Sequence, residues 1–473
     1  MLEQIVPEKD YTVIVEDSHP SIREYSIRIC ICSNSEKADK AGNKYLPKFQ
    51  KISTNVYGVF LPKLNVDNRE WWVLAGSFSS KEEALAFRKK TGEVPDGEII
   101  ELIIQPATGT LMCGEKQSAN QLRIVPAEPH PGVITIKNVL VGIGFHWQHY
   151  ETQSLCGFLE IVVNNEGKLT AIDVAPVEEY LASVNSSEMR ADCPAELLKA
   201  QTVAARSTIF ATMGKHHYSE PFHLCADDHC QDYHGYGAIK EVSRQAAQST
   251  YGEVLMFENH VCDARYAKIC GGVTEDYKNV WDAREIPYLT SVLDSEEPIK
   301  IPLEDESVAR NYIDSSPDVY CNTTRYSIPE SLSEAKKLFR WEVEYTRQEL
   351  QDIISQKLAV DFGELMDIVP GKRGVSGRLM DIKIIGTLQQ ITVKRELEIR
   401  RVLSKSHLYS SCFYIQRERD SAGAIKKFIL RGAGWGHGVG MCQIGAGVMA
   451  ARGFGYDAIL RHYYKGAQLQ RIY

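Results

Sequence analysis

The spacing of hydrophobic and polar positions changes several times along this chain. In residues 10–35 and 55–76, apolar side chains alternate with polar ones and include many β-branched and aromatic residues, a pattern typical of strands. Between Ser80 and Gly92 the apolar residues take a helical spacing, with a serine cap before them and a glycine after them. These elements predict a small α/β unit over residues 1–95.

The rest of the chain, residues 96–473, is predicted to form a second, larger domain. Strand patterns occupy 96–175, where NNEGK suits a hairpin turn, and they return at 252–268 and 378–416. Helical patterns occupy 177–189 and 194–213, the segment RWEVEYTRQELQDIISQKL reads as a strand followed by an amphipathic helix, and VMAARG and YDAILRHYY form a helical tail. We therefore expect an α+β domain with mainly antiparallel sheets, and a long surface connection at the polar, turn-rich residues 296–335.

Composition narrows the class of protein. The 473 residues are 44% hydrophobic and 25% charged, which is close to the average of globular proteins. A formal net charge of −8 argues against nucleic acid or an anionic membrane as the main partner. We expect no membrane span, because the chain lacks a run of about 18 apolar residues. The first residues, MLEQIVPEKDYTVIVEDS, also lack the pattern of a secretory signal.

Glu188 is the first candidate for chemistry. It lies between two helical patterns, in VNSSEMRADCPAELLKAQTVAARS. By spacing alone, an acid in such a place is better explained as a solvated side chain or a helix cap.

The second candidate is a cluster of histidines and cysteines in KHHYSEPFHLCADDHCQDYHGYG. Cys225 and Cys230 have several histidines around them, at positions 216, 217, 223, 229 and 234. Zinc favours four nitrogen or sulfur ligands in a tetrahedron, and this segment can supply them. The spacing is not that of a common zinc finger, so a disulfide or two free thiols remain the alternatives.

The third candidate is the glycine-rich loop GWGHGVGMCQIGA, residues 434–446. Glycines allow positive φ angles and close approach of the backbone to a ligand. A nucleotide-binding loop is not predicted, because the GxGxxG match is out of register, comes too late for a βαβ unit, and has no GK[ST] after it.

These three segments, in this order, resemble the SpoIID/LytB family. The carrying motifs are VEEYLASVNSSEMRADCPAELLKAQTVAARSTIFA, CADDHCQDYHG and GWGHGVGMCQIGAGVMAARGFGYDAILRHYY, and the resemblance covers residues 97–473. In addition, WWVLAGSFSSKEEALAFRKKTGE resembles the last strand and helix of a SPOR domain, a glycan-binding module, although an unrelated strand and helix would read the same way.

The resemblance implies a peptidoglycan lytic transglycosylase that cleaves the MurNAc–GlcNAc β-1,4 bond of glycan strands, and denuded strands are the expected substrate. Its helices would flank a glycan groove. Glu188 would be the single acid and base, since attack by the sugar's own C6 hydroxyl gives a 1,6-anhydro product without a second carboxylate. To hold its proton, Glu188 would need a pKa near 6, a shift of about 2.3 kcal/mol. The expected substrate-binding residues are Arg206, Tyr266, Gly271, Gly272, Trp435, His437 and Gln443.

The same resemblance implies a zinc site. Cys225, His229 and Cys230 map onto the family's ligands, and His216 is the expected fourth ligand, with His217 or His223 as the alternatives. Two cysteines and two histidines close the coordination, so this zinc would be structural.

The chain departs from the family pattern at two serine positions. AKICGGVTED stands where the family has HSTSGGxTED, and GMCQ stands where it has GMSQ. We expect the resulting cysteines, Cys270 and Cys442, to form a thiol pair or a disulfide.

The alternative function is a peptidoglycan-binding protein that does not cleave, like the family's amidase enhancers, with a cell-wall amidase as partner. Because both functions act on peptidoglycan, we expect the chain to lie in the cell envelope or periplasm, or outside the cell.

Overall fold

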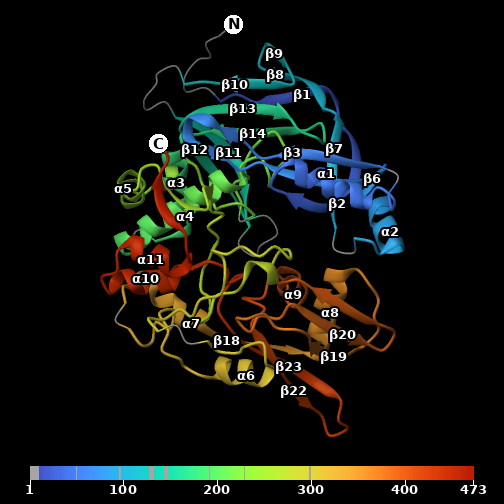
Figure 1. Ribbon diagram of the computed structural model, residues 1–473, viewed down its shortest axis with the longest axis vertical. Helices are drawn as coiled ribbons and strands as arrows, with labels where there is room; N and C mark the ends of the chain where they lie inside the picture. Colours follow the sequence, from blue (N-terminus) through green and yellow to red (C-terminus); the bar gives the residue numbers. More distant parts are fainter. Residues whose placement is uncertain are drawn as a thin grey trace. The chain divides into compact units, whose positions relative to one another are not determined.

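The computed structural model describes residues 10–49, 51–94, 97–126, 133–142, 148–190, 192–227, 229–297, 300–326 and 328–473 (Figure 1). The chain forms two compact units. The first contains Met1–Val141, Tyr150–Ser183 and Ile209–Ile239, and the second contains Gly142–His149, Val184–Thr208 and Lys240–Tyr473. The α+β class with mainly antiparallel sheets is confirmed. The division between the compact units differs from the boundary expected after residue 95.

A four-stranded sheet with two helices begins the first unit. Its elements in chain order are β2 (Ile22–Cys32), α1 (Ser35–Tyr45), β3 (Ile52–Tyr57), β6 (Glu70–Phe78), α2 (Lys81–Thr91) and β7 (Glu98–Gln105). The strand order β3-β6-β2-β7, antiparallel throughout, is that of a ferredoxin-like split βαβ fold. Since β7 pairs with β2, the chain beyond residue 95 completes this sheet.

The helix predicted after Ser80 is confirmed as α2. The side chain of Ser80 accepts a hydrogen bond from the Glu83 N–H, and Gly92 ends the helix in the left-handed conformation with φ 63°. Helix α1 was not predicted, because SEKADKAGNKY has almost no apolar face; only Ala38 and Gly42 are buried.

The two faces of this sheet are covered differently. Helix α1 approaches Val73 through Gly42, and helix α2 packs Ala84 against Ile27, which pairs with Ala75 on the same face as Val73. The opposite face carries Trp72, Leu74 and Ile100, and these contact Tyr218. The ring centroids of Trp72 and Tyr218 lie 5.1 Å apart, and the Tyr218 hydroxyl accepts a hydrogen bond of 3.0 Å from the Glu101 N–H. The sheet therefore anchors the segment that also contains the candidate histidines.

The other strands of the first unit form small sheets. They are β1 (Val13–His19) with β8 (Thr108–Cys113) and β9 (Lys116–Ala119); β10 (Gln121–Ile124) with β13 (Phe158–Val163) and β14 (Leu169–Val174); β11 (Ile134–Val141) with β12 (His149–Leu155); and β4 (Phe60–Leu61) with β5 (Val66–Asp67). The NNEGK hairpin joins β13 to β14 as predicted.

The second unit contains more helices. Its strands are β15 (Glu253–Phe257), β16 (His260–Val261), β17 (Tyr266–Ala267), β18 (Arg340–Thr346), β19 (Leu365–Pro370), β20 (Asp381–Gly386), β21 (Gln390–Lys394), β22 (Phe413–Arg419), β23 (Ile425–Ala433), β24 (Met441–Cys442) and β25 (Gln468–Arg471). Its helices are α5 (Glu241–Ser249), α6 (Glu306–Asp314), α7 (Lys336–Phe339), α8 (Arg347–Leu358), α9 (Glu396–Val402), α10 (Gln443–Ala451) and α11 (Tyr456–Tyr463). The division between units passes through α3 (Val177–Glu188) and α4 (Ala195–Thr212). The 3-10 turns are η1 (Pro62–Leu64), η2 (Tyr236–Ala238), η3 (Tyr277–Asn279) and η4 (Glu330–Ala335).

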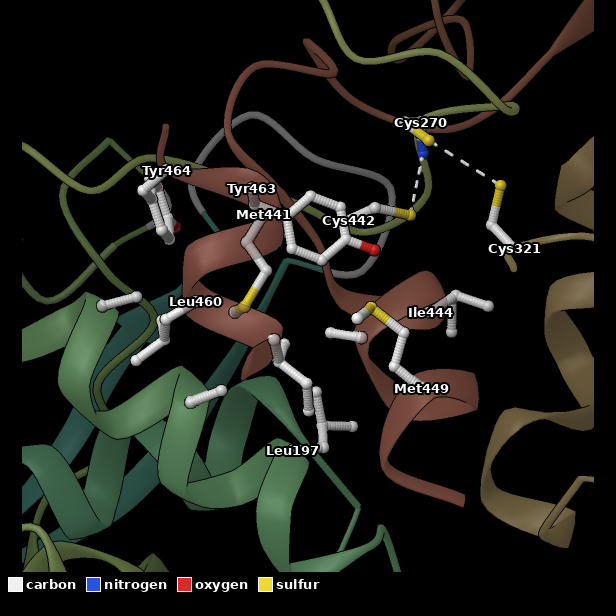
Figure 2. Packing of buried hydrophobic residues seen from close by; sticks show 14 of the residues in the cluster. Leu197, Cys270, Cys321, Met441, Cys442, Ile444, Met449, Leu460, Tyr463 and Tyr464 are labelled. Carbon is white, nitrogen blue, oxygen red and sulfur yellow. Dashed lines mark hydrogen bonds between the residues drawn. The ribbon is translucent and has the colours of Figure 1, made fainter. Parts of the chain in front are cut away.

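Two hydrophobic cores stabilise this second unit. One packs α8 and α9 against the sheets β18-β23-β22 and β19-β20-β21. The other gathers Leu197 of α4 with residues of α10 and α11, including Met449 and Leu460 (Figure 2). Part of 296–335 is not a surface connection, which corrects that expectation: it contains α6, and Cys321 is fully buried in the second core.

In the part of the chain that the structure describes, no helix combines the length and apolar character that crossing a membrane requires.

Candidate functional site

Glu188 is held by two side chains that are distant in sequence. It ends α3 and is partly exposed. The Tyr266 hydroxyl donates a hydrogen bond of 3.2 Å to Oε1, and Nε2 of Gln443 donates one of 3.2 Å to Oε2. Nζ of Lys268 lies 3.4 Å from the Glu188 carbonyl oxygen. Both carboxylate oxygens therefore have a neutral donor, and their orientation is fixed.

A short parallel pairing brings the two donors together. Strand β17 pairs with β24, with Tyr266 opposite Met441 and Ala267 opposite Cys442. Gln443 follows β24 directly and is the first residue of α10, whose N-cap is Cys442. The pairing thus fixes Tyr266 and Gln443 relative to each other.

Gln443 is itself buried, with 2% of its surface exposed. Its Nε2 also lies 3.4 Å from Oε1 of Gln201, a buried residue of α4. This burial makes Gln443 a residue that positions Glu188, and its predicted contact with substrate is not supported. Gln201 and Lys268 were missed as members of the site, because nothing in their spacing distinguishes them from other polar residues.

Two buried charged side chains fix the surrounding loops. Arg378 donates to the carbonyl oxygen of Cys270 at 3.1 Å and to that of Gly436 at 3.3 Å, so it joins the loops that flank β17 and β24. Glu275 accepts hydrogen bonds from the N–H and hydroxyl of Ser376, and burial raises the pKa of its carboxyl group.

Trp435 and His437 lie on the glycine-rich loop, next to the Tyr266 segment. Trp435 pairs with Ile269 through hydrogen bonds of 2.8 and 3.2 Å, and 37% of its surface is exposed. The His437 ring packs 4.8 Å from that of Trp281, and its Nδ1 accepts the Val439 N–H. Burial, with smaller effects of Arg265 and Arg378, lowers the pKa of His437 to about 3. His437 is therefore a neutral ring with its proton on Nε2.

Three predicted substrate-binding residues lie in the protein interior instead. Arg206 has no exposed surface, and its guanidinium donates to the carbonyl oxygens of Glu253 at 3.0 Å and Ala247 at 3.4 Å. Gly271 and Gly272 are buried with φ angles of 85° and 118°, and a Cβ at Gly272 would lie 2.1 Å from the Tyr312 hydroxyl oxygen. Their glycine character serves backbone packing.

In the first unit, four residues place their ligand atoms within 4.8 Å of one another: His217, Cys225, His229 and Cys230. The Cys230 sulfur lies 3.3 Å from Nε2 of His217 and 3.8 Å from Nδ1 of His229. His216 is not part of this set, although its Nδ1 is 4.0 Å from the same sulfur, and the expected fourth member is corrected to His217. His223 is not part of it either.

The donors of this cluster suit a metal ion. A tetrahedral zinc ion with bonds of about 2.3 Å to sulfur and 2.05 Å to nitrogen separates the two atoms by about 3.6 Å, between the two distances observed. Hydrogen bonds, first from Cys230 and then from His217 and His229, lower the pKa of the Cys225 thiol to about 2. Thiolate is the form of cysteine that binds metals.

Cys270 and Cys442 are brought together, but they are not alone. Their sulfurs lie within 4.8 Å of each other, of the Cys321 sulfur (Figure 2) and of an Asp294 oxygen, and none of the twelve cysteines forms a disulfide. Of the two expected alternatives, the structure shows two neighbouring thiols and not a disulfide, and it adds Cys321 and Asp294 to the pair. Sequence reasoning missed Cys321 and Asp294 because both come from segments outside the quoted motifs.

The fold and the site define an α+β protein in which a glutamate at a helix end is oriented by a tyrosine and a glutamine from two paired loops. Comparison with known proteins finds family models that match parts of the chain. Residues 165–257 match the model described as Stage II sporulation protein (SpoIID). Residues 275–440 match a domain of unknown function, DUF8618.

Known proteins are also similar to parts of this chain. Stage II sporulation protein D of Bacillus amyloliquefaciens is 26% identical over 63% of this chain and 75% of its own length. Its counterpart in Bacillus subtilis is 27% identical over 63% of this chain and 76% of its own length. The amidase enhancer of Bacillus subtilis is 26% identical over 61% of this chain and 40% of its own length.

Proposed function

We propose that this protein cleaves the glycan strands of peptidoglycan as a lytic transglycosylase, with Glu188 as acid and base. The observation that carries the proposal is the convergence of Tyr266 and Gln443 on the two oxygens of Glu188. The relatives named Stage II sporulation protein D and amidase enhancer support a role at the cell wall.

The reaction needs one carboxyl group and no external water. Protonated Glu188 donates its proton to the glycosidic oxygen between MurNAc and GlcNAc as that bond breaks. The C6 hydroxyl oxygen of MurNAc then bonds to its own C1, and the Glu188 carboxylate takes the hydroxyl proton. The proton is thereby returned to Glu188, and the products are a 1,6-anhydro sugar end and a free GlcNAc end.

The residues around Glu188 have separate tasks in this scheme. Tyr266 and Gln443 fix the direction of the carboxyl group, which must reach two different oxygens in succession. Trp435, the exposed aromatic side chain of the glycine-rich loop, offers a face on which a sugar ring can stack.

We further propose that His217, Cys225, His229 and Cys230 hold a zinc ion. With four protein ligands the ion would have no open position, and it would hold the cysteine segment in place without taking part in the reaction.

The sheet at the start of the first unit would add glycan affinity. Its split βαβ arrangement contains the strand β6 and helix α2 that resemble a SPOR domain. Binding of purified glycan strands by residues 1–126 alone, if that segment folds, would measure this contribution.

A second candidate function is enhancement of a cell-wall amidase, which the name of the amidase-enhancer relative favours. Both functions place the protein in the cell envelope or outside the cell. Peptidoglycan is the shared binding partner.

Glu188→Gln separates the two. Purified wild type should release anhydro-sugar ends from denuded glycan strands, and Glu188→Gln should not. Glu241→Gln, a change of an exposed glutamate in the same compact unit, should keep full activity. If neither wild type nor Glu188→Gln cleaves, while both bind strands and both accelerate an added amidase, the cleavage proposal fails and the enhancer function replaces it.

A further inference from the structure

Four buried side chains in the second unit form a group that the proposed cleavage reaction does not use. They are Cys270, Asp294, Cys321 and Cys442, and each is at most 2% exposed. They come from four separate segments: the loop after β17, the turn after Val292, the segment after α6, and the end of β24. No simple sequence motif links them.

Their spacing is that of a tetrahedral thiolate site. The sulfurs of Cys270 and Cys321 are 3.7 Å apart (Figure 2), and the Cys270 sulfur is 3.6 Å from Oδ2 of Asp294. A zinc ion bound at about 2.3 Å to sulfur and 2.1 Å to oxygen separates two sulfurs by about 3.8 Å, and sulfur from oxygen by about 3.6 Å. The ligand atoms of all four residues lie within 4.8 Å of one another.

The surroundings supply the hydrogen bonds that metal–thiolate centres need. The Cys442 sulfur accepts the N–H groups of Cys270 at 3.2 Å and Gly445 at 3.4 Å, and the Cys270 sulfur accepts the Gly272 N–H at 3.3 Å. Such bonds orient ligand sulfurs and stabilise their negative charge.

The carboxylate is oriented in the same way. Oδ1 of Asp294 accepts the Tyr463 hydroxyl at 2.6 Å, and Oδ2 accepts the Cys321 N–H at 2.9 Å. These two donors fix the plane of the group and leave Oδ2 facing the sulfurs. An apolar core surrounds the whole group, including Val319 and Ile444. An ionised carboxylate in such a place is costly to bury unless a cation compensates its charge.

Two arginines donate hydrogen bonds to the backbone of the loop after β17. Arg378 donates to the carbonyl oxygen of Cys270 at 3.1 Å, and Arg340 donates to that of Gly271 at 3.0 Å. Three thiolates and a carboxylate exceed the charge of a divalent ion, and nearby guanidinium groups offset the excess.

We propose that Cys270, Asp294, Cys321 and Cys442 bind a divalent, thiolate-preferring metal ion, with zinc as the favoured ion, at a closed structural site separate from the histidine–cysteine cluster. The bound ion would join the loop after β17 to the start of α10. Because Cys442 directly precedes Gln443, the ion would stabilise the element that orients Glu188. The proposal does not depend on glycan cleavage.

The test is the zinc content of the full chain, purified with zinc as the sole added metal and examined by native mass spectrometry. In a His217→Ala background, which removes a member of the histidine–cysteine cluster, we expect one bound zinc per chain. Adding Cys321→Ser should remove that zinc. Adding Cys412→Ser, a change of another buried free cysteine that belongs to neither group, should leave it in place.

A second measurement covers the case in which Cys321→Ser does not fold. X-ray absorption at the zinc edge of His217→Ala should give a shell of three sulfurs and one oxygen or nitrogen. Loss of all zinc in His217→Ala would overturn the proposal. So would a chain mass two hydrogens lower with a disulfide mapped among Cys270, Cys321 and Cys442.

Discussion

The Nε2 amide of Gln443 lies 3.2 Å from Oε2 of Glu188, although 255 positions separate the two residues in the chain. The contact depends on the pairing of β17 with β24, which also delivers Tyr266 to the other carboxylate oxygen. Four measurements follow from the geometry of the two units.

Gln443→Ala should lower the rate of glycan cleavage by about 10- to 100-fold, because a hydrogen bond to an ionised group contributes about 1.5–3 kcal/mol. The measurement is kcat for release of anhydro-sugar ends, with circular dichroism to verify folding. Gln416→Ala changes an exposed glutamine of β22 and should leave kcat unchanged. Equal rates for wild type and Gln443→Ala would show that the contact does not orient the acid.

His217→Ala should lower the zinc content by one ion per chain, whereas His216→Ala should not, because His217 and not His216 belongs to the group of four ligand atoms. Elemental analysis of the two purified variants compares neighbouring histidines in the same segment. The reverse result would restore the expectation from sequence that His216 is the ligand.

His234 should make stability depend on pH. Its ring lies 3.0 Å from Asp232 and 2.7 Å from Glu151, and hydrogen bonding to Asp232, followed by the charge of Asp232 and the contact with Glu151, raises its pKa to about 9. Because the folded pKa exceeds the unfolded value of about 6.5, the stabilisation is complete below about pH 6.5 and is lost as pH rises through about 9.

His234→Gln should therefore lower the melting temperature at pH 6 more than at pH 10. If the difference in melting temperature between wild type and variant stays constant over this range, the raised pKa of His234 is contradicted.

Arg206→Met should destabilise the protein by about 3 kcal/mol, because it removes the guanidinium that donates to the carbonyl oxygens of Glu253 and Ala247 inside the core. Chemical denaturation of the variant measures this loss. Arg461→Met, at an exposed position of α11, should change stability by less than about 0.5 kcal/mol. At a temperature where Arg206→Met is folded, its KM for glycan strands should equal that of wild type; a raised KM would return Arg206 to the substrate-binding residues.

Elements whose ends are marked by caps, glycines or turn residues could be predicted from the sequence. The helix after Ser80 has a cap, a periodic apolar face and a closing glycine, and the NNEGK turn lies between two strand patterns, so both were predicted correctly. Helix α1 lacks an apolar face, and its stability comes from packing on a sheet that the sequence does not display.

The candidate site was predictable only where a motif carried it. Glu188, Tyr266 and Gln443 were chosen by family resemblance, and the structure brings all three together. Arg206 was chosen in the same way but is buried, since a motif arginine that supports the core has the same spacing as one that contacts a ligand. Asp294 and Cys321 could not be predicted, because their meeting with Cys270 and Cys442 depends on tertiary contacts between four separate segments.

The pairing of β17 with β24 also has a consequence for the order of folding. The chain between these strands includes all of residues 275–440, and closing so long a loop is slow compared with forming local helices and hairpins. During synthesis, Glu188 leaves the ribosome well before Gln443, so the carboxyl group acquires its second donor only when the chain is nearly complete. On refolding from denaturant, the contact between Gln443 and Glu188 should form after most helix and strand signals have returned. A nascent or truncated chain that lacks Gln443 would leave the carboxyl group of Glu188 without its second donor.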